Sequence, residues 1–547
     1  MSTYSLRQRL TRTWYALNRW AVWVWIIGGL VALPILTITV KLWDGPGSIW
    51  PHVVDHLLLD YVSNSLLLSV GCIALTFAMG VASAWYVTRY EFVGRKVAEW
   101  LLLLPLSIPS YISAYAYAGI FDYGGSVERL GAALGWTIPH LDVMNIYGLV
   151  LVLSSSLFPY VYLSTRAAFL YQSQNLRDAS RLLGASESAF IRRIALPLAR
   201  PAIIGGLVLV LMEVLNDYGA AKHYGVPTFT TGIFRAWFSL ESLETAVYLA
   251  AILVVLVFAL LGIERWQRSG ISYVSGHGGR RGAWRKPVAG GTRAGLVLAV
   301  GLPILLGFIL PVLQLLYWAY LTFAEVAKAE FGLIVLQTML VAGFTALFTT
   351  GLAFLLIYFT KWSPLGGTRW ISRTATLGYA IPGAVIALGV MVPTLAVDKW
   401  LAALFQNQFG ISLGLLLNWT AIALVYAYAV RFLAVAYNPL EASTLKVGAH
   451  LSESAQLLGN SPWRALWNIE WPLVRTGFWS AAILVFVDVL KELPLTLILK
   501  PHGIQTLAVK AYEYASDERI AESALPALLI VLSGVIFALL FNKTIDR

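Results

Sequence analysis

The chain has 547 residues, of which 59% are hydrophobic and only 12% are charged. Because soluble globular domains carry roughly a quarter charged residues, this composition excludes a soluble protein and predicts an integral membrane protein. The formal net charge of +11 does not indicate nucleic-acid binding, since Lys and Arg cluster in short segments between long apolar runs. The single cysteine, Cys72, excludes an intrachain disulfide.

Twelve segments are long and apolar enough to cross a membrane, because a spanning helix requires about 20 mainly apolar residues. In chain order they lie near residues 20–43, 62–88, 98–120, 144–171, 199–220, 245–264, 293–322, 334–360, 370–396, 413–436, 474–499 and 521–541. We therefore expect an all-α integral membrane protein with twelve transmembrane helices.

The positions of Lys and Arg predict the orientation of the chain. The N-terminal tail (1–19) contains four Arg and no acidic residue, so we expect it in the cytoplasm. Basic residues return after the second and fourth predicted helices, at 89–96 and 177–193, whereas the loop after the first helix has none. The first apolar run has no cleavage site typical of a signal peptide. We predict a multi-pass protein of a bacterial cytoplasmic (inner) membrane with both termini in the cytoplasm.

A basic segment, 265–292, divides the predicted helices into two sets of six. We expect a first transmembrane domain at 20–264 and a second at 293–547. The segment is rich in Gly, Ser and Arg, which is typical of a flexible cytoplasmic linker, and a basic regulatory or lipid-contacting patch is the alternative. Six crossings per half give both halves the same orientation, which predicts parallel rather than inverted repeats.

An internal repeat supports this division. Over 178–200 and 453–475, eight of the 23 positions are identical at a constant offset of 275, among them a Gly and a Pro that lie 13 residues apart. Ile108-Pro109 corresponds to Ile381-Pro382 at an offset of 273. We therefore expect the two halves to share one fold.

Each copy of the repeat predicts a first helix that ends at the Gly, followed by a turn and a short second helix at 187–194 or 463–469. We expect the Pro to end this short helix just before the next span. An acidic residue at the start of the first helix favours its positive dipole end. The short helix mixes apolar and polar residues, so one face can be buried against a partner protein. An ordinary loop is the alternative, but two copies at the same spacing in corresponding cytoplasmic loops favour a docking surface.

These two segments resemble the EAA loop of permeases from binding-protein-dependent ABC importers. The family pattern is Glu-Ala-Ala, three residues, Gly, a variable stretch and Ile-x-Leu-Pro. The copies depart from it mildly, at Asp178 and Ser180 in the first and at Ser454 and Trp471 in the second. The resemblance implies a type I ABC importer-like fold whose short helices couple to an ATPase. It implies these coupling residues: Asp178, Ala179, Gly184, Pro197, Glu453, Ala455, Gly459 and Pro472.

The two copies are not equal. Arg192 and Arg193 of the first copy correspond to Trp467 and Asn468 of the second. We therefore predict an asymmetric pair of coupling segments on one chain.

Finer features resemble the fused two-half permeases of ferric iron importers. The strings at 213–219, 431–441 and 488–496 carry this resemblance. It implies a permease subunit that moves ferric iron from an extracytoplasmic binding protein into the cytoplasm by alternating access. Thiamine or another small solute is the alternative substrate, and an ion-coupled secondary transporter or a membrane-embedded enzyme is the alternative class.

The chain has no Gly-x₄-Gly-Lys-Ser/Thr phosphate loop and no soluble stretch large enough to capture a substrate. We therefore expect two protein partners, a cytoplasmic ABC ATPase dimer and an extracytoplasmic solute-binding protein, together with membrane lipid and no nucleic acid. ATP and Mg²⁺ belong to the ATPase, so we expect neither a cofactor nor catalytic residues on this chain.

Ionisable residues within predicted spans are costly to bury and therefore indicate function. We expect such residues to line the translocation route or its gate. They are Glu213, Asp217, Asp488, Lys491 and Glu492. The alternative is that Lys491 pairs with Asp217 or Glu213 and locks the two halves together.

We expect no resident metal site. His52 and His56 are four residues apart, but ferric iron prefers oxygen ligands, so a solvated loop or a contact with the binding protein is the favoured interpretation. Tyr111, Tyr115 and Tyr117 are interpreted as packing or pathway-lining groups rather than ligands.

Overall fold

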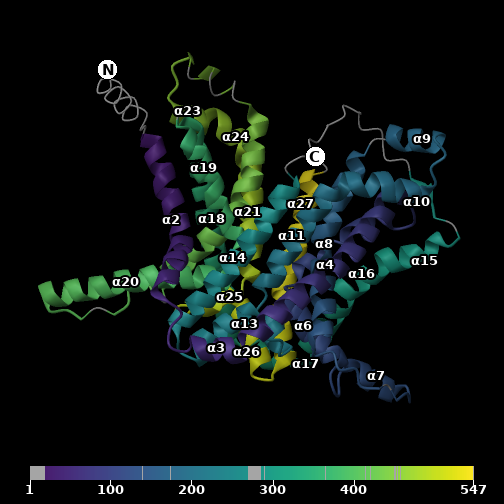
Figure 1. The fold of residues 1–547 in the computed structure, drawn as a ribbon, viewed down its shortest axis with the longest axis horizontal. Coiled ribbons are helices and arrows are strands. Elements are labelled where there is room, and N and C mark those ends of the chain that lie inside the picture. Colours follow the sequence, from purple (N-terminus) through teal and green to yellow (C-terminus); the bar gives the residue numbers. More distant parts are fainter. Residues whose placement is uncertain are drawn as a thin grey trace. The chain divides into compact units, whose positions relative to one another are not determined.

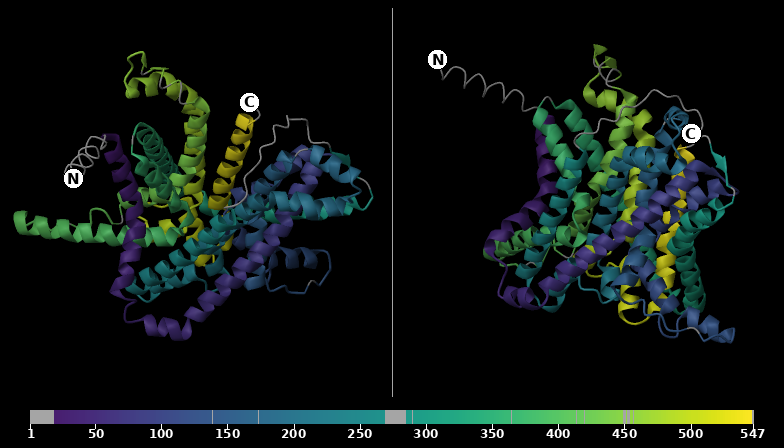
Figure 2. Two further views of the ribbon diagram at one scale, coloured as in Figure 1. Left: turned by 45° about the horizontal axis from the view of Figure 1, so that its top comes forward. Right: turned by 45° about the vertical axis from the view of Figure 1, so that its right-hand side comes forward.

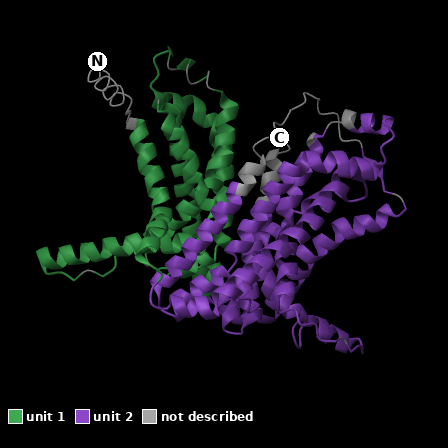
Figure 3. Ribbon diagram, viewed as in Figure 1, with its two compact units in different colours: residues 1–46, 330–509, 543–547 green, residues 47–329, 510–542 purple. Residues whose placement is uncertain are grey.

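The computed structural model describes residues 19–137, 139–172, 174–268, 285–288, 290–363, 365–412, 414–418, 420–448, 451, 454–455 and 457–545. Within these ranges, the single sheet is a two-residue parallel pairing of β1 (Tyr90–Glu91) with β2 (Lys286–Pro287), and the other regular elements are helices (Figure 1). The chain forms two compact units (Figure 3). Unit 1 comprises residues 1–46, 330–509 and 543–547, and unit 2 comprises residues 47–329 and 510–542.

Unit 2 contains most of the first half of the sequence. Its elements up to β2 are α3 (Trp50–His56), α4 (Leu58–Arg89), β1, α5 (Arg95–Leu101), η2 (Leu104–Ser107), α6 (Ser110–Phe121), α7 (Ser126–Ala133), α8 (Ile146–Tyr171), α9 (Gln174–Leu182), α10 (Glu187–Phe190), η3 (Ile191–Ala195), α11 (Leu196–Asn216), α12 (Gly219–His223), α13 (Phe229–Phe234), η4 (Arg235–Ser239) and α14 (Leu243–Arg268). After β2 follow α15 (Thr292–Leu296), η5 (Val297–Gly301), α16 (Leu302–Ile304), η6 (Leu305–Ile309), α17 (Leu310–Val326), η9 (Ile520–Ser523) and α27 (Ala524–Ile545).

Unit 1 contains most of the second half. Its elements are α2 (Arg19–Lys41), η1 (Leu42–Asp44), α18 (Ala329–Trp362), α19 (Gly366–Ala375), η7 (Thr376–Ala380), α20 (Gly383–Phe409), α21 (Ala421–Val447), α23 (Pro462–Ala465), η8 (Leu466–Glu470), α24 (Trp471–Lys491), α25 (Pro494–Leu499) and the start of α26 (Leu507–Ser516). The remainder of α26, from Lys510, belongs to unit 2.

The compact units do not coincide with the two sequence halves. Helix α2 comes from the first half but belongs to unit 1, and α15 to α17 come from the second half but belong to unit 2. In unit 1, α2 packs closely on α19 and α20. A Cβ on Gly28 would lie 2.1 Å from Ile371 Cγ2, and one on Gly389 would lie 2.5 Å from the Pro34 carbonyl oxygen. Each unit therefore combines helices from both sides of the segment 265–292.

The predicted membrane spans are largely confirmed. In the described residues, ten helices are long and apolar enough to cross a membrane, and a helix pair bent by 96° (Arg95–Ser107 and Ser110–Ala133) makes an eleventh if it is one span. A shorter apolar helix, Ile520–Ile536, corresponds to the last predicted span. These results confirm the all-α, two-repeat architecture, with several boundaries displaced by ten or more residues.

Two predicted spans, 98–120 and 370–396, are not continuous helices. Both break at the Ile-Pro pairs of the repeat, where η2 and η7 end and α6 and α20 begin. The proline ring disfavours helical backbone at the residue before it, and Ile108 and Ile381 are extended. Pro109 and Pro382 have matching backbone angles, with φ −54° and ψ 142° and with φ −54° and ψ 141°. The predicted correspondence of these pairs is confirmed.

Helix α20 extends away from the other helices of unit 1 (Figures 1 and 2). The chain that follows it is tied back by one buried carboxylate. Asp398 accepts hydrogen bonds from the backbone N–H groups of Leu416, Leu417 and Asn418 at 2.9 to 3.0 Å. These N–H donors take the place of the water molecules that the carboxylate loses when it is buried.

In unit 2, helices α4, α8 and α11 pack side by side (Figure 1). A Cβ on Gly80 of α4 would lie 2.7 Å from Val161 Cβ, and one on Gly206 of α11 would lie 2.9 Å from the Tyr160 carbonyl oxygen. Helices in lipid associate through close packing at such small residues, because no hydrophobic force drives them together. This bundle positions the first copy of the duplicated segment, which leads into α11.

Candidate coupling segments and intramembrane charges

Two continuous helices of 30 residues carry the duplicated segment. One runs over Glu187–Asn216 through α10, η3 and α11, and the other over Pro462–Lys491 through α23, η8 and α24. Their first and last residues correspond at the offset of 275. At 1.5 Å per residue each helix is about 45 Å long, which exceeds the hydrocarbon core of about 30 Å. Part of each helix therefore extends beyond the membrane.

The prediction that Pro197 and Pro472 end the short helices is wrong. The helices continue through both prolines because the preceding turns, η3 and η8, are π-helical. A proline lacks an N–H and clashes with the carbonyl four residues earlier. In each π turn the last N–H before the proline donates five residues back, from Leu196 to Ile191 and from Trp471 to Leu466. The wider turn accommodates the proline without a break.

The turns before the short helices are the same in both copies. Gly184 and Gly459 adopt left-handed backbone with φ +78° and +85°, which favours glycine. Backbone bonds that close the preceding helix run from Ala185 to Ser180 at 3.0 Å and from Asn460 to Ala455 at 3.1 Å. Ser186 and Ser461 then cap the short helices through their side chains. The predicted order of helix, Gly turn and short helix is confirmed for the described residues.

A pair of leucines directly before each Gly is almost fully exposed, a feature that the sequence analysis missed. The exposed fractions are 89% for Leu182, 87% for Leu183, 89% for Leu457 and 84% for Leu458. Such pairs at matching positions outside the apolar spans indicate a docking surface for another protein. The available sequence signal was their identity in both copies.

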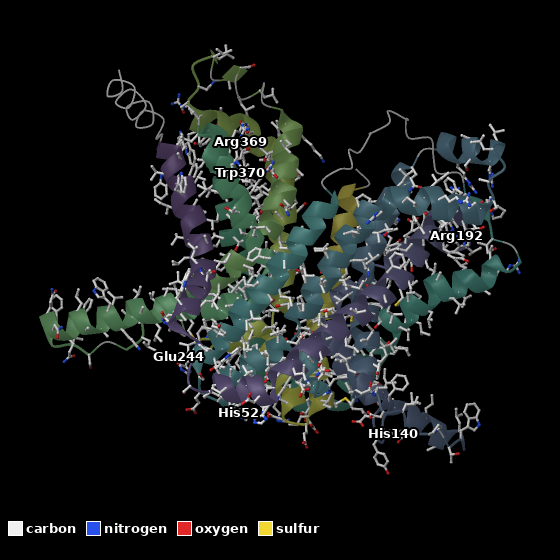
Figure 4. The ribbon with its side chains drawn as sticks, viewed as in Figure 1. His52, His140, Arg192, Glu244, Arg369 and Trp370 are labelled. Atoms are coloured by element: carbon white, nitrogen blue, oxygen red, sulfur yellow. The ribbon has the colours of Figure 1, made fainter. Side chains whose placement is uncertain are left out.

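The short helices each bury one face and expose the other. Phe190 and Ala195 are buried in the first copy, and Ala465 and Glu470 are buried at the same positions of the second. The opposite faces carry different chemistry in the two copies. Exposed residues there are Arg192 and Arg193 in the first copy (Figure 4) and Trp467 and Asn468 in the second. The predicted asymmetry of the two segments is present in their exposed faces.

The first copy is fixed by ion pairs around Glu187. This carboxylate pairs with Arg177 at 2.9 Å, with Lys286 at 2.9 Å and with Arg89 at 3.4 Å. Arg89 is the last residue of α4, and Lys286 lies in β2, near the end of the segment predicted to be a linker. The described part of that segment is therefore held against the short helix.

The second copy is fixed mainly by aromatic packing. Lys361 of α18 donates to both oxygens of the buried Glu470 at 2.9 Å. Around this pair, the tryptophans of α23, η8 and α24 contact rings of α2 and α18. The pairs include Trp463 with Trp362 at 5.9 Å, Trp467 with Phe354 at 6.3 Å and Trp471 with Phe354 at 5.6 Å between ring centroids. Contacts between aromatic rings thus hold most of the second copy in place, whereas ion pairs hold the first.

The remaining predicted coupling residues differ in exposure. Asp178 and Ala179 are exposed on α9, whereas Ala455 is buried. Glu453 lies outside the described residues. Their roles in coupling stay a prediction.

The five predicted gate residues lie at the opposite ends of the 30-residue helices from the coupling segments. Glu213 is on the last turn of α11, and Asp217 follows its end. Asp488 and Lys491 are on the last turn of α24, and Glu492 follows its end. Asp217 and Glu492 therefore occupy corresponding positions in the two units.

Different groups stabilise these two corresponding carboxylates. Asp217 accepts hydrogen bonds from Ser110 Oγ at 2.6 Å and from the backbone N–H groups of Ala220 and Ala221 at 3.1 and 3.0 Å. Glu492 instead pairs with the Arg431 guanidinium at 3.2 Å, and both side chains are buried. The sequence analysis did not pair Arg431 with Glu492.

Lys491 pairs with Asp488 of its own helix at 2.8 Å. Its predicted pairing with Asp217 or Glu213 would join the two units and stays a prediction.

The two histidines of the first loop lie on a helix, α3, with ring centroids 5.0 Å apart. Helix α3 precedes the first residue of α4, whereas the last residue of α4 pairs with Glu187. Since α4 has 32 residues, His52 and the first coupling segment lie at opposite ends of unit 2 (Figure 4).

No cluster of three or more His, Cys, Asp or Glu suited to a metal ion occurs among the residues described.

Two apolar repeats, each with a long helix that carries an exposed turn at one end, define a membrane transport permease. The chain belongs to the family of binding-protein-dependent transport system inner membrane components, whose model matches residues 74–263 and 367–547. It is thus the multi-pass inner-membrane permease of an ATP-driven ABC importer, a transport component and not an enzyme.

Several relatives share this architecture. The chain is 27% identical to the Fe(3+)-transport system permease protein FbpB 2 of Haemophilus influenzae over 491 residues, which cover 89% of this chain and 90% of the relative. It is 24% identical to a probable molybdenum ABC transporter permease of Haloferax volcanii over 47% of this chain and 94% of the relative. The sulfate transport permease CysW of Escherichia coli is 28% identical over 37% of this chain and 71% of the relative. Relatives of half the length therefore align with one part of this chain, as expected of a fused permease.

Proposed function

We propose that this chain is the permease of a ferric iron importer. The duplicated coupling segment, with its exposed leucine pairs, carries the mechanistic part of this proposal. Similarity to FbpB 2 along nearly the whole of both chains supports ferric iron as the substrate. The relatives named for molybdenum and sulfate align with less than half of this chain, so molybdate and sulfate serve as comparison substrates.

In this proposal, a cytoplasmic ATPase dimer binds the two coupling segments, and ATP and Mg²⁺ bind to that dimer. A loaded solute-binding protein docks on the extracytoplasmic side, where α3 and the gate residues lie. Both termini face the cytoplasm, as the arginines of the N-terminal tail favour. Closure of the ATPase dimer then moves the coupling helices as rigid bodies and opens the permease inward.

The proposal is tested by uptake in proteoliposomes that hold the permease with its ATPase and binding protein. Ferric iron, molybdate and sulfate are offered separately, each with ATP or a non-hydrolysable analogue. We expect ATP-dependent accumulation of ferric iron and background levels of the two oxyanions. Oxyanion uptake would refute the substrate, and uptake driven by an ion gradient without ATP would refute the mechanism.

A further inference from the structure

Helix α6 of unit 2 carries polar groups along one face. Tyr111 and Tyr115 are four residues apart, and Asp122, seven residues further, directly follows the end of the helix. Positions with this spacing lie on one side of a helix. The first residue of α6, Ser110, donates to the buried Asp217. The face therefore leads from an exposed carboxylate to a buried one over 12 helical residues, or about 18 Å.

Helix α12 adds an imidazole to this face. The ring of His223 packs edge-on against Tyr115 with centroids 4.7 Å apart, and Tyr115 contacts Tyr111 at 5.8 Å. Asp122 lies within electrostatic reach of His223, and Asp217 lies within reach of Tyr115. The two phenol rings and the imidazole thus adjoin one another along α6, and a carboxylate lies toward each end of the helix.

Two atoms of this group are buried without a hydrogen-bond partner among the described residues. They are Tyr115 Oη and His223 Nε2. Tyr115 is only 1% exposed. On the same helix, by contrast, Tyr117 Oη donates a hydrogen bond to the Leu306 carbonyl at 2.7 Å. An unpaired buried polar group destabilises a fold, and its retention indicates a ligand or a function.

The other half of the chain shows that the fold does not require these polar groups. At the offsets of the repeat, Tyr111 and Tyr115 correspond to Ala384 and Leu388 of α20, and His223 corresponds to Ile498 of α25. All three counterparts are buried in unit 1. The same architecture is therefore built with apolar side chains at these positions.

The buried carboxylates show the same contrast. Glu492 of unit 1 has a guanidinium partner, whereas Asp217 makes no ion pair within the described part of unit 2. A negative group that lacks a fixed cation favours the approach of a mobile one. Phenolate and carboxylate oxygens are hard donors, and imidazole also binds iron.

We propose that Tyr111, Tyr115 and His223 form a transient coordination site for the transported ferric ion, between Asp122 and Asp217. The inference rests on the proposed function and adds to it the residues that contact the substrate. Binding replaces the phenolic proton of Tyr115 by the metal ion, and that proton leaves to the aqueous phase. For Tyr111 and Tyr115 this proposal replaces the interpretation as packing or pathway-lining groups rather than ligands, whereas Tyr117 keeps that interpretation.

The decisive variants are Tyr115→Phe and His223→Leu, measured by ferric uptake in proteoliposomes and by thermal unfolding. Each removes an unpaired buried atom, so the unfolding midpoint should stay the same or rise. Uptake should nevertheless fall at least fivefold. The matched control, Tyr117→Phe, loses a formed hydrogen bond and should lower the midpoint without a comparable loss of uptake per folded protein. Wild-type uptake by Tyr115→Phe would overturn the inference.

A binding measurement separates this inference from the proposed function. Ferric citrate is titrated into the purified permease–ATPase complex, and the visible tyrosinate-to-iron charge-transfer band is recorded. We expect the band for the wild type and its loss in Tyr115→Phe. A wild type that imports ferric iron without any such band would refute the coordination site alone. A wild type that imports no ferric iron would refute the proposed function.

Discussion

Two buried carboxylates, Asp217 and Glu492, occupy the same position in the repeat and differ in how their charge is compensated. Removing a charge from water costs several kcal/mol unless hydrogen bonds or an opposite charge replace the solvent. Asp217 accepts three hydrogen bonds, whereas Glu492 forms an ion pair with Arg431. We therefore expect the Arg431–Glu492 pair to contribute to stability, while the gate roles of Asp217 and Glu492 stay predictions.

The substitution Arg431→Met should destabilise the protein by about 3–5 kcal/mol, because it leaves Glu492 buried without a cation. Thermal unfolding of the purified permease measures the loss. The double variant Arg431→Met/Glu492→Leu removes both charges and should regain most of the stability. A double variant as unstable as the single one would contradict this account.

Lys491→Met should be much milder. Lys491 is 28% exposed at its side chain, and its ion pair with Asp488 is of the intrahelical kind that contributes about 0.3–0.5 kcal/mol. If Lys491 belongs to the gate, uptake should fall or the basal ATPase rate should change without loss of stability. Unchanged uptake and unchanged basal ATPase would exclude the gating role.

At the level of elements, each predicted coupling segment is the capped N-terminal part of a helix that continues into a transmembrane helix. A left-handed glycine reverses the chain, a serine caps the short helix, and a π turn carries it through a proline. Each helix is continuous over 30 residues, from the exposed turn to the charged far end. We therefore expect a displacement at one end to reach the other end without a hinge at the proline.

The exposed leucines provide a direct test of docking. Leu182→Asp/Leu183→Asp should weaken binding of the ATPase by tenfold or more, since buried apolar anchors dominate such interfaces. Stability should not change, because both side chains are exposed. The control is Leu130→Asp on α7, which is 63% exposed elsewhere in unit 2. Co-elution of the ATPase with each variant is the measurement, and equal retention by all variants would rule out this docking surface.

The glycines test the asymmetry of the two segments. A Cβ on Gly184 or Gly459 would meet no atom within 4 Å, so alanine costs only the left-handed backbone, about 1–2 kcal/mol in each case. Ion pairs hold the short helix of the first copy, whereas packed aromatic rings hold that of the second, so Gly184→Ala should reduce ferric uptake more than Gly459→Ala. Equal losses would argue against an asymmetric pair.

At the level of the whole molecule, the two compact units exchange helices between the sequence halves. Unit 1 needs α2 from the first half, and unit 2 needs α15 to α17 from the second. Neither half of the sequence therefore contains a complete apolar core of its own.

A chain divided within 269–284 tests this interdependence. Co-expressed halves should assemble and transport, because the cut leaves every described element intact. Either half expressed alone should be degraded or aggregate, since helices such as α2 would lack their packing partners. Membrane content of each half, detected with separate tags, measures the outcome. A stable half expressed alone would contradict it.

The sequence by itself determined the class of the protein, the two repeats and the location of the duplicated segments. Those features depend on local composition and spacing: apolar length sets the spans, a left-handed turn selects Gly184 and Gly459, and an Ile-Pro pair breaks each half at the same point.

Only the tertiary structure decided which helices form each unit, that Arg431 neutralises Glu492, and that Tyr115 differs from Tyr117. These features depend on contacts between residues far apart in the chain, which apolar periodicity in a membrane protein does not encode because both lipid and neighbouring helices accept apolar side chains. The exposed leucines and the π turns at Pro197 and Pro472 belong to the same group. The sequence does not show whether a leucine is buried, faces lipid or is exposed at a loop. A proline in the sequence indicates a missing backbone donor but not the turn by which the helix accommodates it.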